Sequence, residues 1–436
     1  AAMSKSYSDE ICLMNFNIKF QRVFILLLLT FVCIHSSAQV LQPATAPNAA
    51  QKELIKRGYG MFIHFGVNTF TDLEWSDGTT PATAYNPTNL DPDQWVRTAK
   101  EAGFRYVLLI TKHHDGFCLW DSKYTDYDVA SSPVKTDVVK AVAYACKKYG
   151  LQFAIYYSLW DRHEPSFNDP NPQKYIDYML NQLKELFTNY GSICELWLDG
   201  GWKRSPSDWG IDQVYKLVKQ YNPKCAVSVN HTIVNEEGKR KFTLPSLMTE
   251  DNKYFFHYFP SDFRLWDPKI ITKFDKKQYL HEGKSYYLPY EHTICLSSRW
   301  NWFQKSAQLP VRELDELQEL FYWCTDNDNS LVINVPPDKT GRIREYEALT
   351  VIEGVVAPLL HAYVAAPVAV SVTEPPAQNV VAPPAVIVAV GFANTFTATG
   401  NEVTEQPAAL VTVKVTVALE LTVIEDVVPP LDHAYV

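Results

Sequence analysis

The stretch FRYVLLIT at Phe104–Thr111 decides the fold class, because it is a mostly apolar run rich in β-branched and aromatic residues. A strand of this kind is buried on both faces, as in a parallel sheet that is covered by helices. Helical spacing precedes it at Pro92–Ala102 and follows it at Asp137–Tyr149, which ends before Gly150, a common helix-ending residue. A buried strand between two helices predicts a β/α unit.

The same alternation continues on both sides of this unit. Further strands are predicted at Met61–Gly66, Leu151–Ser158, Ile193–Leu198 and Ala226–Asn230, and further helices at Lys174–Tyr190 and Asp208–Tyr221. About 300 residues of this alternation favour a (β/α)8, TIM-type barrel over an open sheet. No GxGxxG or GxxxxGK[ST] motif follows a strand, so nucleotide-binding folds lose support. We therefore predict a catalytic α/β barrel over residues 39–343.

Composition sets broader limits on the function. The chain has 436 residues, of which 47% are hydrophobic and 20% charged, and this excludes a disordered protein. A net charge of -9 without a long basic run argues against a nucleic-acid partner. The 8 cysteines form no CxxC pair, which argues against a zinc ribbon or a disulfide-rich miniprotein. We expect several of the six cysteines beyond the leader to be buried thiols, although an oxidising compartment would permit pairing.

The N-terminal residues 1–38 are typical of a leader with a secretory signal peptide. Lys19 and Arg22 precede the apolar run Val23–Ile34, and Ser36–Ala38 supplies small residues for cleavage. The apolar run is shorter than the roughly 20 residues that span a bilayer, which disfavours a membrane anchor. We expect a secreted protein, with the periplasm as its destination and no stable membrane span after cleavage.

The sequence changes character after Arg344, where Val, Ala and Pro dominate. The segment TVIEGVVAPLLHAYV at Thr350–Val364 nearly repeats as TVIEDVVPPLDHAYV at Thr422–Val436. Runs of β-branched residues separated by prolines predict a small β-sandwich over residues 344–436. A second interpretation of the contrast is that this tail is not authentic protein sequence.

Polar and aromatic residues gather where the predicted strands end. They are His64, then Glu74 and Trp75 in the loop after the first strand, His113 and His114 after the second, Tyr156 at the third, and Trp197 and Asp199 at the fourth. The carboxyl ends of parallel barrel strands meet at one rim. Aromatic faces there can pack against a pyranose while polar groups bond its hydroxyls, so the rim predicts a sugar site.

Hydrolysis of a glycoside needs two carboxyl groups, one that attacks C1 or activates water and one that protonates the leaving oxygen. Asp199 is the candidate nucleophile, because it follows an apolar strand and precedes Gly200-Gly201. Glu291, in YLPYEHTICL, is the favoured acid, since aromatic neighbours would raise its pKa. Glu250, in SLMTEDN, is the alternative acid.

A metal site is the competing hypothesis for the histidines. His113, His114 and Asp115 could be ligands, with His64 and His231 nearby. Adjacent histidines at one strand end point in different directions, however, and no HExxH motif occurs. We therefore predict neither a metal nor another cofactor.

Several motifs occur in the order found in one known family. They are IHFG at Ile63–Gly66, EW at Glu74–Trp75, KHHDGF at Lys112–Phe117, IYYS at Ile155–Ser158, ELWLDGGW at Glu195–Trp202 and NSLVINVPPDKTGRI at Asn329–Ile343. Together they resemble the α-L-fucosidases of glycoside hydrolase family 29. The resemblance implies a (β/α)8-like barrel followed by a β-sandwich, and hydrolysis of terminal α-L-fucosides with retention through a fucosyl-enzyme intermediate.

The resemblance also implies roles for individual residues. The nucleophile of the family falls on Asp199, and its sugar-binding positions fall on His64, Glu74, Trp75, His113, His114, Tyr156 and Trp197. Its acid/base glutamate is best matched by Glu291, ahead of the segment SRWNW. The long separation of Asp199 from Glu291 suggests an insertion around Glu237–Lys284 and keeps Glu250 as the alternative. Asn230-His231 replaces a motif that carries an arginine in the family.

Two other functions remain open at this point. One is a fucose-binding homologue with weak or no catalysis, and the other is an α-L-galactosidase-like glycosidase, since L-galactose differs from L-fucose only by a hydroxyl at C6. The expected partner in each case is a glycan, and for the favoured function it is a fucosylated one.

Overall fold

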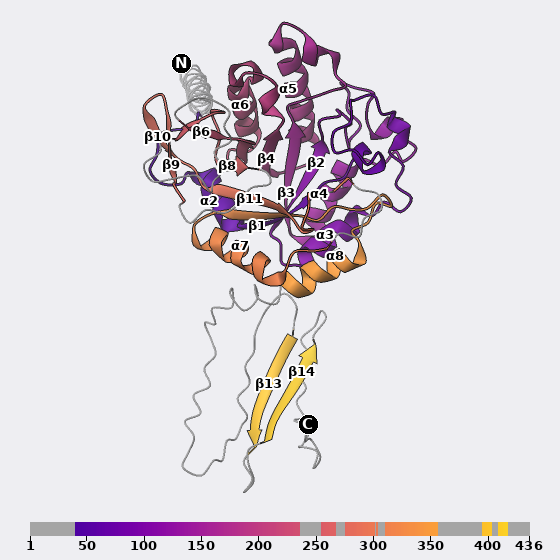
Figure 1. Cartoon of the computed structure of the whole chain (residues 1–436), viewed down its shortest axis with the longest axis vertical. Helices are drawn as coiled ribbons and strands as arrows, with labels where there is room; N and C mark the ends of the chain where they lie inside the picture. Colours follow the sequence, from indigo (N-terminus) through magenta and orange to yellow (C-terminus); the bar gives the residue numbers. More distant parts are fainter. Residues whose placement is uncertain are drawn as a thin grey trace, which may run out of the picture.

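The structure is a computed structural model, and Figure 1 shows it coloured along the chain. The described residues are 40–235, 254–266, 275–300, 302–303 and 310–355, with two further strands at 395–402 and 409–416. The predicted leader at 1–38, the alternative acid Glu250 and most of the predicted β-sandwich lie outside these residues. These predictions therefore stay predictions.

Eight parallel strands form one sheet in the order β5-β4-β3-β2-β1-β12-β11-β8. Their bounds are β1 (Tyr59–Ile63), β2 (Tyr106–Lys112), β3 (Gln152–Ser158), β4 (Ile193–Asp199), β5 (Ala226–Val229), β8 (Arg264–Trp266), β11 (Tyr290–Cys295) and β12 (Ser330–Asn334). The two edges meet, because the backbone N–H of Asp262 donates to Val227 at 2.7 Å and that of His231 donates to Leu265 at 3.1 Å. The predicted barrel is thereby confirmed.

Helices cover the outside of this barrel (Figure 1). They are α2 (Ala49–Arg57), α3 (Pro92–Glu101), α4 (Val138–Tyr149), α5 (Pro172–Asn189), α6 (Ile211–Tyr221), α7 (Leu314–Asp326) and α8 (Glu345–Leu349). The predicted ends of the helix at Asp137–Tyr149 are confirmed in α4. Asp137 caps α4 by accepting from the backbone N–H of Lys140, and Gly150 ends it in the left-handed region with φ 70°.

The β/α alternation is interrupted around β8. There the described residues form a second sheet of order β10-β9-β7-β6, built from β6 (Ile233–Asn235), β7 (Tyr254–Phe256), β9 (Gln278–His281) and β10 (Lys284–Tyr287). Glu282 and Gly283 both have positive φ, which is the geometry of a tight hairpin turn between β9 and β10. This sheet lies where the sequence suggested an insertion.

Side chains inside the barrel are stacked in levels. Because alternate strand residues face the same side, Glu195, Trp197 and Asp199 of β4 point inward at three successive levels, from the amino to the carboxyl end. Phe62, Leu108, Ile110 and Val332 fill the interior with Trp197. The upper level, at the carboxyl end, is the rim where the candidate site residues gather.

The described chain beyond the barrel is limited to two strands, β13 (Thr395–Glu402) and β14 (Ala409–Thr416), which pair antiparallel. They lie within the range predicted to form a β-sandwich, which stays a prediction. No helix among the described residues is long and apolar enough to span a membrane. The six described cysteines are buried free thiols, as expected.

Candidate active site

Asp199 ends β4 at the upper level of the barrel and is 5% exposed. The hydroxyl of Tyr156 donates to its Oδ2 at 2.8 Å, and the amide of Asn230 donates to its Oδ1 at 3.1 Å. Burial raises the pKa of Asp199, while these two donors act against the rise. Asp199 is thus a desolvated carboxylate held in one orientation, as a nucleophile requires.

Gly200 fixes the turn that follows Asp199. Its φ is 78°, and a Cβ there would lie 2.7 Å from Cβ of Trp160 and 3.2 Å from Cε1 of His114. Only glycine tolerates this conformation and contact without strain. The absence of a side chain at Gly200 therefore makes room for Trp160.

His114 lies beside the nucleophile, with Nε2 3.6 Å from Oδ2 of Asp199. The hydroxyl of Ser158 donates to the carbonyl oxygen of Trp160 at 2.5 Å, so the 2.6 Å contact between Ser158 and Nδ1 of His114 must be donated by the histidine. Burial, foremost, lowers the pKa of His114 well below its usual value. A neutral His114 therefore turns an unprotonated Nε2 toward the site, ready to accept from a hydroxyl.

His64 and His113 complete the ring of histidines. Nδ1 of His64 lies 3.0 Å from Oδ1 of Asn334 and donates to it, while the amide of Asn68 lies 3.3 Å from Nδ1 of His113. His64 thus keeps an acceptor at Nε2, whereas His113 keeps a donor there. Burial lowers the pKa of His64 well below its usual value and that of His113 to about 3, so both are neutral.

Glu74 and Trp75 lie at the mouth of the barrel. Burial and the negative charge of Asp199 raise the pKa of Glu74, and a hydrogen bond from Trp300 opposes the rise. Trp75 is 47% exposed, and its ring centroid is 5.8 Å from that of His114. The structure therefore brings both residues to the predicted site, and Glu74 is close enough to Asp199 to sense its charge.

The aromatic wall of the site comes from residues that sequence reasoning did not assign. The rings of Trp300 and Trp302 lie 5.0 and 5.1 Å from that of His64. Trp197, expected to bind sugar, lies one level lower with no exposed surface, stacked 5.3 Å beneath Tyr156. Both tryptophans belong to the segment SRWNW, but the local sequence does not indicate that their rings lie against His64.

Glu291 does not lie where the sequence placed it. It is the second residue of β11, pairs with Ser330, and has no exposed surface. Tyr106 donates to one of its oxygens at 2.9 Å and Trp197 to the other at 3.0 Å, and it also bonds the side chain of Glu195. Glu195 precedes Asp199 by four residues, or about 13 Å along a strand. Glu291 therefore cannot face Asp199 across a scissile bond.

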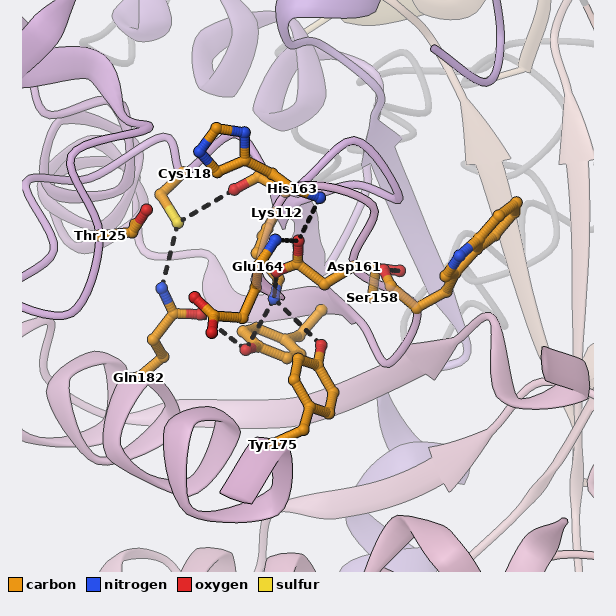
Figure 2. A network of polar contacts seen from close by, with 12 residues as sticks. Lys112, Cys118, Thr125, Ser158, Asp161, His163, Glu164, Tyr175 and Gln182 are labelled. Atoms are coloured by element: carbon orange, nitrogen blue, oxygen red, sulfur yellow. Dashed lines mark hydrogen bonds and ion pairs between the residues drawn. The ribbon is translucent and has the colours of Figure 1, made fainter. Parts of the chain in front are cut away.

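A buried ion pair outside the sheet supports the rim, as Figure 2 shows. The ammonium of Lys112 donates to Oδ2 of Asp161 at 2.6 Å and to the hydroxyl of Tyr157 at 2.9 Å. The pairing of β2 with β3 shifts between Ile110 and Lys112, so Lys112 turns outward and His113 and His114 follow at the rim. Oδ1 of Asp161 accepts from the backbone N–H of His163, which fixes the loop after β3.

Elsewhere on the described residues, the alternatives to the rim as a candidate site are a cavity and a metal site. A cavity of about 630 Å³ lies at the amino end of the barrel, lined by residues such as Arg57, Cys146, Cys194 and Lys224. Glu53, the acid in its lining, is paired with Lys224 at 2.9 Å. No group of three or more metal-ligating side chains occurs in the part of the chain that the structure describes.

Comparison with known proteins identifies the family. The family model described as alpha-L-fucosidase matches residues 31–354. The chain belongs to the alpha-L-fucosidase family. Alpha-L-fucosidase 1 of Arabidopsis thaliana is 33% identical over 342 residues, which cover 74% of this chain and 63% of that protein. A crystal structure of a glycoside hydrolase 29 family member from an unknown rumen bacterium is 30% identical with a TM-score of 0.56, covering 73% of this chain and 57% of that one.

The family assignment confirms the resemblance that the motifs indicated. This alpha-L-fucosidase homologue spans less than two thirds of the length of these relatives, 63% and 57%. Its eight barrel strands and the rim residues described above lie within the matched range.

Proposed function

We propose that this protein hydrolyses terminal α-L-fucosides with retention of configuration, through a covalent fucosyl-enzyme intermediate on Asp199. The observation that carries the proposal is the buried carboxylate of Asp199, held by Tyr156 and Asn230 beside His114. One structural neighbour is described as a trapped covalent intermediate of a GH29 alpha-L-fucosidase from Bacteroides thetaiotaomicron with 2-fluoro-fucosyl fluoride. That description agrees with a nucleophilic role for a residue like Asp199.

The reaction follows from two carboxyl groups. An oxygen of Asp199 attacks the anomeric carbon, the bond from C1 to the leaving oxygen breaks, and a carboxylic acid protonates that oxygen. The resulting carboxylate then takes a proton from water, which attacks C1 and frees fucose and Asp199. In a retaining enzyme the two carboxyl groups lie about 5–5.5 Å apart.

The neutral histidines supply the hydrogen bonds to the sugar. His64 and His114 each offer an acceptor at Nε2, and His113 offers a donor. Two acceptors and one donor can together bind three hydroxyl groups, so the site favours a polyhydroxylated ligand over an apolar one. The rings of Trp300 and Trp302 lie against His64 and supply an apolar face for the C5 methyl group.

The proton donor is reassigned because Glu291 lies below the rim. Among the described carboxyl groups Glu74 meets the requirements, since it is partly buried, has a raised pKa and senses Asp199. Glu250 and Asp267 are alternatives outside the described residues, and Asp267 directly follows Trp266, the last residue of β8. We take Glu74 as the donor and test it against the other two.

The donor is found by substituting Glu74, Glu250 and Asp267 with alanine, one at a time. Loss of the donor should cost about 10²–10⁴-fold in turnover of a natural glycoside. It should cost much less for an aryl fucoside, whose leaving group needs no proton, and azide should restore the rate with an α-fucosyl azide product. If Glu74→Ala slows both substrates equally and azide has no effect, Glu74 binds sugar and the donor is another carboxyl.

The activity itself is tested with 4-nitrophenyl α-L-fucoside. We expect nitrophenol release, with α-L-fucose as the first anomer in the NMR spectrum. Tight fucose binding without release would instead make the protein a binding homologue. An α-L-galactoside should be cleaved more slowly, although an apolar wall at C5 rejects an added hydroxyl by only about 10²-fold.

We further propose that the natural substrate is a fucosylated glycan met outside the cytoplasm, in the periplasm of a bacterial cell. The support is the signal-like leader, in which Lys19 and Arg22 precede the apolar run Val23–Ile34 and small residues follow. N-terminal sequencing of the exported protein should find a start at Gln39.

A further inference from the structure

Two basic side chains flank Trp160 at the mouth of the barrel. Nζ of Lys203 lies 3.9 Å from the centroid of the Trp160 ring, and Cζ of Arg162 lies 4.9 Å from it. Both cations are within the range in which the face of a tryptophan attracts positive charge. Trp160 is only 9% exposed, whereas Lys203 is exposed and Arg162 is half-buried. The charged groups of Lys203 and Arg162 are therefore accessible to solvent, whereas the ring of Trp160 is not.

The chain ties these cations to the reacting centre. Lys203 ends the short 3-10 turn η5 (Gly201–Lys203), which follows Asp199 after one residue. The backbone N–H of Leu159 donates to the carbonyl oxygen of Asp199 at 2.7 Å, so Trp160 follows directly beside the nucleophile. After burial and the neighbouring His113, the charges of Lys203 and Arg162 also lower the pKa of His114, in keeping with their place beside the site.

Neither cation is paired with a carboxylate among the described residues. Within the described ranges no Asp or Glu oxygen lies within 4.0 Å of Lys203 or Arg162, although many other basic residues have such partners. Hydrogen bonds from Thr79, foremost, and then the charge of Arg162 lower the pKa of Asp77, which is an exposed residue. Two positive charges that no described carboxylate neutralises stand out at the mouth of a chain with a net charge of -9.

The leaving group must pass these charges. The histidines lie inside the rim, whereas Trp75, which is exposed, and Trp202, which is half-buried, form its outer edge, with ring centroids 6.3 Å apart. Trp202 immediately precedes Lys203 in η5, and the Trp75 ring lies 5.8 Å from that of Trp160. A sugar attached to the fucose would lie along this edge, within reach of both cations.

We propose that Lys203 and Arg162 form a subsite for an anionic group, a carboxylate or a sulfate ester, on the saccharide to which the fucose is attached. The inference rests on the proposed function, because it assumes that fucose occupies the ring of histidines. An exposed pair of opposite charges changes a rate constant by about two- to fivefold, and salt screens it. The preference should therefore be moderate and salt-dependent.

The experiment compares 4-nitrophenyl α-L-fucoside with its 3-carboxy-4-nitrophenyl counterpart, which differs by one negative charge on the leaving group. The wild type should show a higher kcat/KM for the charged substrate, mainly through KM, and 0.5 M NaCl should remove the advantage. Lys203→Met and Arg162→Met should each lower the ratio of the two kcat/KM values about two- to fivefold. They should leave turnover of the neutral substrate nearly unchanged.

Lys147→Met is the matched control, because Lys147 is an exposed lysine at the carboxyl end of α4, at the opposite end of the barrel. It should leave the ratio as in the wild type. Fucosyl-glucuronate, fucosyl-glucose 6-sulfate and fucosyl-glucose then distinguish carboxylate from sulfate as the preferred group. Equal kcat/KM for charged and neutral substrates, or a ratio that the two variants do not change, would overturn the inference while leaving the fucosidase activity intact. Cleavage of neither aryl fucoside would overturn both.

Discussion

Asp199 and Glu291 are both buried carboxyl groups inside the barrel, and they differ in what surrounds them. Asp199 accepts hydrogen bonds from Tyr156 and Asn230 at the rim. Glu291 lies two levels lower, where it accepts hydrogen bonds from Tyr106 and Trp197 and forms another with the side chain of Glu195. Burial and the charge of Glu195 raise the pKa of Glu291 well above its usual value. Glu291 is therefore a neutral acid of the core.

The first prediction concerns Glu291→Gln. Glutamine is neutral and has nearly the same shape, and it can still donate to Glu195 and accept from Trp197. Its amide nitrogen cannot accept from Tyr106, but Ser330 lies 3.1 Å from that hydroxyl and keeps it bonded. We expect a loss of about 0.5–1.5 kcal/mol in the free energy of unfolding and little change in kcat. A drop of about 10²–10⁴-fold in turnover would show that Glu291 is the proton donor after all.

The second prediction concerns the acid side of the pH profile. Asp199 must be ionised to attack, and burial raises its pKa, so kcat/KM should fall as the pH drops through that raised pKa. The amide of Asn230 stabilises the ionised form, so Asn230→Ala should raise the pKa further and move the acid limb to higher pH. An unchanged acid limb would mean that another group controls it. The buried histidines should add no inflection near their usual pKa, since they stay neutral.

At the scale of elements, the strand and helix patterns of β1 to β5 and α3 to α6 were predictable from the sequence, because burial on two faces and capping residues leave local signals. The irregularity between Ile110 and Lys112 leaves no such signal, since it depends on Asp161 in another loop. The sequence also failed to predict the depth of Glu291 inside the barrel, for a similar reason. The pKa of Glu291 is raised as expected, but by burial and the charge of Glu195 and not by the aromatic residues next to it in sequence, and local sequence does not show where along a strand the rim begins.

The third prediction tests the ion pair behind β2. Lys112→Met should lower the free energy of unfolding by about 3–5 kcal/mol, because it leaves the buried carboxylate of Asp161 without a partner. The double variant Lys112→Met/Asp161→Asn should recover part of this loss, since no unpaired charge remains. Urea unfolding of both variants provides the measurement. A loss below 1 kcal/mol in the single variant would contradict a supporting role for the pair.

At the scale of the whole molecule, the chain closes its barrel through residues far apart in sequence. β1 pairs with β12 as well as β2, and the N–H groups of Asp262 and His231 join the last strand in the sheet order to β5. The motifs predicted this architecture because their order matched a family, but they did not predict the second sheet, whose strands are short and lack a helical or barrel pattern. The limits 39–343 and 344–436 stay predictions.

The fourth prediction concerns the tail. All eight barrel strands and the helices that cover them lie before residue 355, and Val351 is fully buried at that end. A chain of residues 39–355 should therefore unfold cooperatively, with a Tm within about 4 °C of that of the full chain. Circular dichroism during heating provides the measurement. An insoluble or unfolded fragment would show that residues after 355 belong to the same folding unit.

The most direct test of the central claim is to trap the covalent intermediate. The full chain is incubated with 2-fluoro-fucosyl fluoride, digested with pepsin and analysed by mass spectrometry. We expect one fluorofucosyl adduct, carried by the peptide that contains Asp199, and no adduct in Asp199→Asn. A label on any other residue, or an enzyme that turns over fucosides with inversion and forms no adduct, would contradict it.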